Sequence, residues 1–98
     1  MIVRIVKLTF QKENIPAFLA IFEKSKHRIR SSKGCSFVEL YQDQTNECIF
    51  FTYSYWNDLS DLEHYRNSSF FKSVWGKTKI LFSDKPEAWS LNKLQSLH

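Results

Sequence analysis

Residues 48–56, CIFFTYSYW, decide the fold of this chain because they form a strand pattern that is apolar on both faces. Successive side chains of a strand point to opposite sides of the sheet, so a strand with one face in water alternates apolar and polar residues. This strand needs cover on both faces instead. One side carries Ile49, Phe51, Tyr53 and Tyr55, and the other carries Phe50 and Trp56.

The composition is that of one globular domain over residues 1–98, with a frayed tail expected at 95–98. Hydrophobic residues make up 43% and charged residues 24%, which favours a folded chain over a disordered one. Nine Phe, four Tyr and three Trp give an aromatic share of 16%, so large rings must be buried. There is no signal-peptide pattern, and no apolar run approaches ~20 residues, so we expect a cytoplasmic protein without membrane contact.

Charge and cysteine spacing argue against several other classes. The net charge of +4 comes largely from basic residues between 24 and 33, which we assign to the last turns of a helix. No nucleic-acid-binding pattern accompanies them, so no nucleic-acid partner is expected. Cys35 and Cys48 would lie about 27 Å apart along a hairpin at ~3.3 Å per residue, too far for a disulfide. Three scattered His and no Cys-x-x-Cys predict no metal site.

Period-2 and helical patterns predict seven elements in the order β-α-β-β-α-α-β. We expect Asn14 to cap the first helix and Gly34 to follow its end. Ser60 and Glu63 form a capping-box pattern for a short second helix, and a third ends at Ser83. The expected strands are 2–10, 35–42, 48–56 and 88–94, and the first helix is 15–32.

This order is the split βαβ, or ferredoxin-like, α+β plan: a four-stranded antiparallel sheet with helices on one face. The helices cover only one of the two apolar sheet faces. A second copy of the chain must then cover the other, so we predict a homodimer whose sheets pack face to face. Trp89 is expected at this subunit contact.

The run FFTYSYWNDLSDLEHYRNSSFFKSVW, followed by KPEAWS, resembles the antibiotic biosynthesis monooxygenase family of dimeric α+β barrel proteins. A strand ending in Trp, a short helix, and a Ser-x-x-Phe step into the next helix carry the resemblance. The matching residues are Trp56, Leu62, Ser68 and Phe71. Family members include monooxygenases that use oxygen without metal or flavin, haem-degrading enzymes, and proteins with no demonstrated activity.

The chain departs from both groups of family enzymes. Many quinol-type members carry two His where this chain has Tyr65 and Phe70, and His64 would point about 100° away from the first position. The haem-degrading members use Asn, Trp and a ligating His at positions that match Val6, Tyr65 and Trp75. We therefore expect no haem and no other cofactor.

A cofactor-independent oxygenase needs a dry aromatic pocket and groups that stabilise a phenol-derived anion. We expect the pocket between helices and sheet, with Tyr53, Tyr65, Phe71 and Trp75 converging on it. Tyr65 would hydrogen-bond a substrate oxygen and Trp75 would stack on the ring. The alternative is that these rings are ordinary core aromatics.

The charged candidates are also open to two interpretations. His64 is either the catalytic base or an exposed helix residue. Arg4 and Lys7 either stabilise a substrate anion or extend to the sheet edge, and Glu39 is expected to pair with one of them.

The sequence thus favours a monooxygenase that oxidises a small quinol or aromatic-polyketide-like phenol with molecular oxygen. The alternative is a non-catalytic homodimer that binds a small apolar ligand or serves in a stress response.

Overall fold

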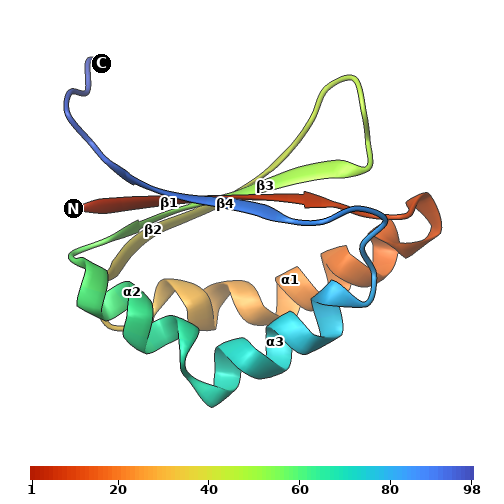
Figure 1. The fold of residues 1–98 in the computed structure, drawn as a ribbon, viewed down its shortest axis with the longest axis horizontal. Coiled ribbons are helices and arrows are strands. Elements are labelled where there is room, and N and C mark those ends of the chain that lie inside the picture. Colours follow the sequence, from red (N-terminus) through yellow and green to blue (C-terminus); the bar gives the residue numbers. More distant parts are fainter.

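The computed structural model describes residues 1–98 and has the predicted ferredoxin-like α+β plan. Three helices lie in one layer beneath a four-stranded antiparallel sheet, and the other sheet face is bare (Figure 1). No helix has the length and apolar character needed to cross a membrane. The elements are β1 (Ile2–Thr9), the 3₁₀ turn η1 (Lys12–Asn14), α1 (Ile15–Arg30), β2 (Cys35–Gln42), β3 (Ile49–Trp56), α2 (Leu59–Arg66), α3 (Ser69–Lys79) and β4 (Glu87–Asn92).

The sheet has the strand order β2-β3-β1-β4, so β1 and β3 lie in the middle. Residues directly opposite each other in an antiparallel pair share a face. Arg4 lies opposite Ser54 of β3 and Ser90 of β4, and all three therefore face the helices. Tyr53 lies opposite Ile5 and so belongs to the bare face.

The core lies between the sheet and the helices and consists mainly of stacked rings. Phe10 and Phe18 stack with centroids 4.3 Å apart, and Phe50 meets Phe18 edge-on at 5.2 Å. A second cluster combines Trp56 and Leu62 with Cys35. Trp56 is 1% exposed. The even-numbered side of the opening stretch is therefore the side that the helices cover.

The structure corrects two predicted helix caps. Asn14 has the position of the cap of α1, but its side chain makes no capping bond and donates instead to the carbonyl of Leu81 at 3.2 Å. The cap of α2 is Asp58, whose Oδ1 accepts from the Asp61 amide at 3.0 Å. Ser60 is inside the helix and donates to Asp58, so the predicted capping box is wrong.

Element ends also differ from the predictions by a few residues. α1 ends at Arg30 rather than at 32, and Gly34 follows in the left-handed conformation with φ of +85°. α3 ends at Lys79, and the next residues leave the helix because Phe82 forms a β-bridge with Phe10. β4 covers Glu87–Asn92 rather than 88–94.

The two cysteines are free, Cys35 buried and Cys48 half-buried. They lie at opposite ends of the β2–β3 hairpin, whose turn is organised by Asp43. The Oδ2 atom of Asp43 accepts from the amides of Thr45 and Asn46 at 3.1 and 2.9 Å.

The bare face of the sheet carries mainly aromatic and aliphatic side chains, with Lys7 and Glu39 among them. Trp89 and Leu91 of β4 are 42% and 44% exposed there. The bare face is made by Val3, Ile5, Lys7, Phe37, Glu39, Tyr41, Phe51, Tyr53, Tyr55, Trp89 and Leu91.

The predicted pairing of Glu39 with Arg4 or Lys7 is wrong, because β2 is not adjacent to β1. Glu39 accepts instead from the Tyr41 hydroxyl on its own strand.

Candidate functional site

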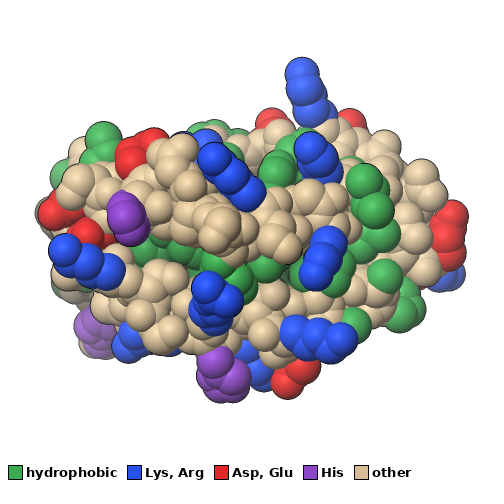
Figure 2. Space-filling model, turned by 90° about the horizontal axis from the view of Figure 1, so that it is seen from below, with side chains coloured by type: hydrophobic (Ala, Val, Ile, Leu, Met, Phe, Trp, Pro, Cys, Tyr) green, Lys and Arg blue, Asp and Glu red, His purple; other side chains and the backbone are tan.

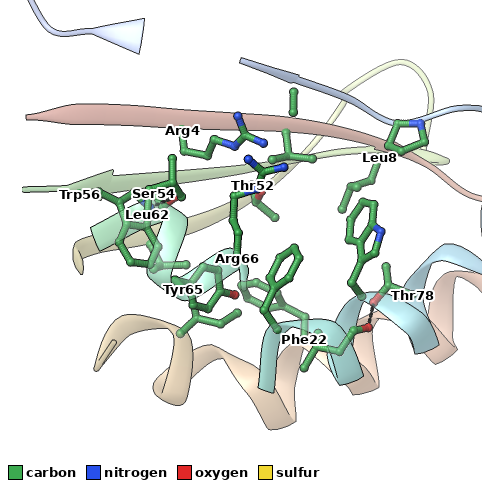
Figure 3. Close-up of a pocket in the computed structure, with 18 of the residues that line it drawn as sticks. Arg4, Leu8, Phe22, Thr52, Ser54, Trp56, Leu62, Tyr65, Arg66 and Thr78 are labelled. Carbon is green, nitrogen blue, oxygen red and sulfur yellow. Dashed lines mark hydrogen bonds between the residues drawn. The ribbon is translucent and has the colours of Figure 1, made fainter. Parts of the chain in front are cut away.

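A cavity of about 300 Å³ lies between the sheet and the helices. Side chains from all four strands and all three helices, or from the segments beside them, line it, and most are apolar (Figure 3). Figure 2 looks at the helical side of the molecule and shows hydrophobic side chains along the seam between the helices, with Lys and Arg around it. The cavity is thus an apolar space within a basic surface.

Stacked aromatic rings form the helical wall of the cavity. Tyr65 contacts Trp56 with ring centroids 4.9 Å apart and meets Phe71 edge-on at 5.1 Å. Phe71 and Trp75 are four residues apart on α3 and lie parallel within 11°, 5.9 Å between centroids. Such a wall matches the flat face of an aromatic ligand.

Local helix capping places these rings. Ser68 caps α3 by accepting from the Phe71 amide at 3.1 Å, and its own hydroxyl donates to the Tyr65 carbonyl at 2.6 Å. One serine therefore ends α2 and begins α3. The tyrosine at the end of one helix and the phenylalanine at the start of the next are brought together as a result.

The Tyr65 hydroxyl is the polar group that points into the middle of the cavity (Figure 3). No other residue of the chain forms a hydrogen bond with it. Burial raises the pKa of Tyr65 well above its usual range, with a smaller contribution from Cys35. Tyr65 is therefore a neutral phenol at physiological pH and is available as a hydrogen-bond donor.

Two arginines supply the positive charge of the cavity. Arg4 of β1 is half-buried and donates to the Ser90 hydroxyl at 3.0 Å. Arg66, the last residue of α2, pairs with Glu63 at 3.3 Å and has a side chain that is 43% exposed. Burial lowers the pKa of Arg4, and the charge of Arg66 lowers it further. The two guanidinium groups therefore act on each other and on whatever the cavity holds.

The remaining polar lining groups are already bonded or small. Trp56 donates from its indole nitrogen to Ser54 at 3.0 Å, and the Thr78 hydroxyl donates to the Val74 carbonyl at 2.8 Å. No His, Cys, Asp or Glu lines the cavity. The lining thus offers no imidazole or thiolate as an axial haem ligand.

The structure brings together four of the six site residues predicted from sequence. Arg4, Tyr65, Phe71 and Trp75 all line the cavity. Tyr53 does not converge with them, because it lies on the bare face of the sheet.

His64 is also outside the cavity and is exposed, since it lies on another side of α2 from its neighbour Tyr65. Sequence reasoning missed Arg66, which looks like any solvated residue at a helix end. It also missed Thr52 and Ser54. The only available signal was that they alternate along β3 on the same face as Trp56.

The family model for antibiotic biosynthesis monooxygenases matches residues 1–74, which include β1, α1, both strands of the β2–β3 hairpin, α2 and the start of α3. The chain belongs to the antibiotic biosynthesis monooxygenase family. The matched region contains the aromatic wall up to Phe71 and both arginines. No curated protein matches the sequence.

Several solved structures superpose closely on the chain. An antibiotic biosynthesis monooxygenase has a TM-score of 0.90 at 16% identity, covering 97% of this chain and 100% of its own. A conserved protein from Methanosarcina mazei Go1 has a TM-score of 0.89 at 20% identity, covering 96% and 94%. PA3566 from Pseudomonas aeruginosa has a TM-score of 0.84 at 20% identity, with the same coverage. At these identities the likeness shows the fold alone.

Proposed function

We propose that this family member is a cofactor-independent monooxygenase that oxidises a small quinol or aromatic-polyketide-like phenol with molecular oxygen. The observation that carries the proposal is the unbonded Tyr65 hydroxyl, directed into an apolar cavity with an aromatic wall. The family's monooxygenase name supports the reaction class.

Binding uses the aromatic wall and one hydrogen bond. The flat ring of the substrate packs against Phe71 and Trp75, which lie parallel to each other. The Tyr65 hydroxyl donates to the substrate's phenolic oxygen, and this bond strengthens when that oxygen becomes an anion. The apolar lining excludes water from the ring carbon that reacts.

The chemistry is carried by the substrate and by oxygen. The phenol loses its O–H proton, and the phenolate gives one electron to O₂, which forms superoxide and a phenoxyl radical. Superoxide adds to a ring carbon that bears hydrogen, para to the phenolic oxygen in a phenol and ortho to it in a quinol, and protonation yields a hydroperoxide. Loss of water then breaks the O–O bond and leaves a quinone. One oxygen atom enters the ring, and the other leaves as water with the O–H and C–H hydrogens.

The protein promotes loss of the substrate's phenolic proton through the electrostatic potential of its positive charges. No carboxylate or imidazole lines the cavity, and the raised pKa of Tyr65 keeps that phenol protonated. The positive charges of Arg4 and Arg66 favour the phenolate form of the substrate, and the proton passes to solvent at the open side, where Arg66 lies. His64 has no part in this step.

Oxygen uptake by metal-stripped protein tests the proposal, with hydroquinones, naphthols and anthrones as candidate substrates. We expect uptake above the autoxidation baseline for one of these classes. Tyr65→Phe and Trp75→Ala should each lower kcat/KM by roughly tenfold or more, as expected for lost transition-state hydrogen bonding and positioning. Uptake that neither variant changes would place the site elsewhere.

Two matched variants serve as controls. Tyr41→Phe removes a tyrosine hydroxyl from outside the cavity, and His64→Gln removes the imidazole that faces solvent. Both should keep wild-type uptake. A loss in His64→Gln alone would restore histidine as the base.

The second candidate function is a non-catalytic homodimer that binds a small apolar ligand or serves in a stress response. The observation in its favour is the absence of any imidazole or carboxylate from the cavity lining. Tight binding of aromatic ligands without oxygen uptake in any substrate class would support it over the enzyme.

We further propose that the functional unit is a cytoplasmic homodimer joined through the bare sheet face. Its apolar side chains support this, because Trp89 and Leu91 are strongly exposed in a single chain. In Figure 1 the tip of the β2–β3 hairpin and the C-terminal tail both extend on this side, so a second copy would lie between them.

A further inference from the structure

Two guanidinium groups lie on one side of the cavity with a single carboxylate near them. Arg4 reaches in from the central strand β1 and Arg66 from the end of α2, and their guanidinium groups approach each other in Figure 3. The only acidic partner is Glu63, 3.3 Å from Arg66. No carboxylate lies within salt-bridge distance of Arg4, whose one bonded partner is the Ser90 hydroxyl.

Most of the donor groups of this pair are unused. A guanidinium has five N–H donors in a planar fork. Arg4 uses Nη1 on Ser90 and Arg66 uses Nη1 on Glu63, and no other hydrogen bond of either group is present. The two like charges also repel each other, which is one cause of the lowered pKa of Arg4. A bound anion would satisfy the donors and relieve the repulsion together.

We propose that the ligand of this cavity is an aromatic carboxylate, whose carboxylate group is bound by Arg4 and Arg66 while its ring lies on the aromatic wall. The inference rests on the proposed function, because the ring is the phenol that is oxidised. A carboxylate has two coplanar oxygens that match the guanidinium fork, whereas a phenolate has one. The phenolic oxygen takes the Tyr65 hydrogen bond and meets the arginines only through their electrostatic potential, so their N–H donors stay available for a second anionic group.

The position of the pair fits a substituent at the open side of the cavity. The Arg66 side chain is 43% exposed, so its charge lies where the cavity meets solvent. Phe71 and Trp75 belong to a different helix, α3, where their rings lie parallel. A cavity of about 300 Å³ is at the lower end of ligand sites, which suits one or two fused rings with a carboxylate.

Binding of 2-naphthoate and 2-naphthamide tests this inference without any need for turnover. The two probes have the same ring and nearly the same shape, and only the first carries a charge. Affinity is measured by calorimetry on the full chain at neutral pH and low salt. We expect 2-naphthoate to bind about tenfold or more tightly than 2-naphthamide, as charge-assisted hydrogen bonds predict.

Variants test whether the preference for the carboxylate depends on the arginine pair or on the positive charge of the protein as a whole. Arg66→Gln is the main variant, because its exposed side chain can be replaced without disturbing the core, and Arg4→Gln is the second. Each should remove most of the preference for the carboxylate and change naphthamide affinity much less, because a neutral amide oxygen accepts a weaker hydrogen bond from a guanidinium. The control Lys77→Gln removes one positive charge from an exposed position of α3 outside the cavity and should keep the preference.

Equal affinity for the two probes, no complex with either probe, or a preference that survives both arginine variants would overturn the inference. Its failure differs from a failure of the proposed function. Oxygen uptake with neutral quinols and no carboxylate preference would retain the enzyme and reject the carboxylate ligand. An arginine-dependent carboxylate preference without uptake in any class would retain the ligand class and reject the enzyme.

Discussion

The indole nitrogen of Trp56 donates a hydrogen bond to the hydroxyl of Ser54, 3.0 Å away and two residues back on the same strand. Both side chains face the helices and both line the cavity. The bond satisfies the indole donor of a residue that is 1% exposed. The Ser54 hydroxyl accepts this bond and keeps its own O–H, so Ser54 and Thr52 can still donate to a ligand beside Tyr65 and the two arginines.

Replacing Trp56 by Phe should lower the free energy of unfolding by about 1–3 kcal/mol, because the hydrogen bond and part of the buried ring are lost. In a double-mutant cycle with Ser54→Ala, the coupling should be about 1 kcal/mol. Urea unfolding of the four proteins measures it. Additive losses would mean that the bond contributes nothing to stability.

The two glycines should respond in opposite directions to substitution by Ala. Gly34 has φ of +85°, and a Cβ there would meet the Asp61 side chain, so Gly34→Ala should cost about 1–2 kcal/mol or more. Gly76 lies within α3, and a Cβ there would meet nothing, so Gly76→Ala should stabilise by about 0.5–1 kcal/mol. Thermal unfolding of both variants checks the pair, and a shift of the same sign would contradict it.

The corrected cap of α2 gives a matched pair of variants. Asp58→Ala removes the acceptor of the Asp61 amide bond and should cost about 1 kcal/mol. Ser60→Ala, at the residue that the sequence pattern favoured, should cost less because its hydroxyl only donates to Asp58. Chemical denaturation compares the two. A larger cost at Ser60 would restore the predicted capping box.

Burial of Tyr65 predicts a loss of stability at high pH. Its pKa is raised in the folded state, so above about pH 10, the usual value for tyrosine, the unfolded chain releases a proton that the folded chain retains. The stability contributed by the neutral phenol is complete below that pH and declines as the pH rises further. Tyr65→Phe lacks this proton, so its free energy of unfolding should decline less steeply between pH 9 and 11 as measured in urea. Parallel curves would contradict a buried phenol.

Two leucines of similar exposure test the dimer. Leu91 lies on the bare sheet face and Leu59 at the start of α2, 44% and 54% exposed. Leu91→Lys should convert a two-chain particle into single chains at micromolar concentration, because an unpaired charge would be buried in the contact. Leu59→Lys should leave the particle intact. Light scattering reports the mass, and a single-chain wild type would refute the dimer.

Periodicity determined most of the fold. Strand patterns such as CIFFTYSYW and helical spacing elsewhere predicted every β-strand and α-helix, although not the 3₁₀ turn η1, because the faces of strands and helices must be buried in regular patterns. The caps were less predictable, since several polar side chains near a helix start compete for the same amides. Asp58 and Ser60 differ by two residues, and only the path of the chain out of β3 selects between them.

The sequence alone determined a two-layer α+β chain whose sheet is apolar on both faces. Only the tertiary structure decided which face lines the site. Tyr53 carries a large ring, yet it lies on the bare face of the sheet, and its neighbour Ser54 faces the helices. The rings of α2 and α3 already occupy the space between helices and sheet, and small residues on β3 leave room there for the cavity. Likewise, no local pattern distinguishes Arg66 from a solvated helix end. Packing of α2 beneath the sheet brings Arg66 close to Arg4, which is 62 residues away in sequence. The chemistry of the site depends on such distances in space, and the spacing of residues along the sequence does not give them.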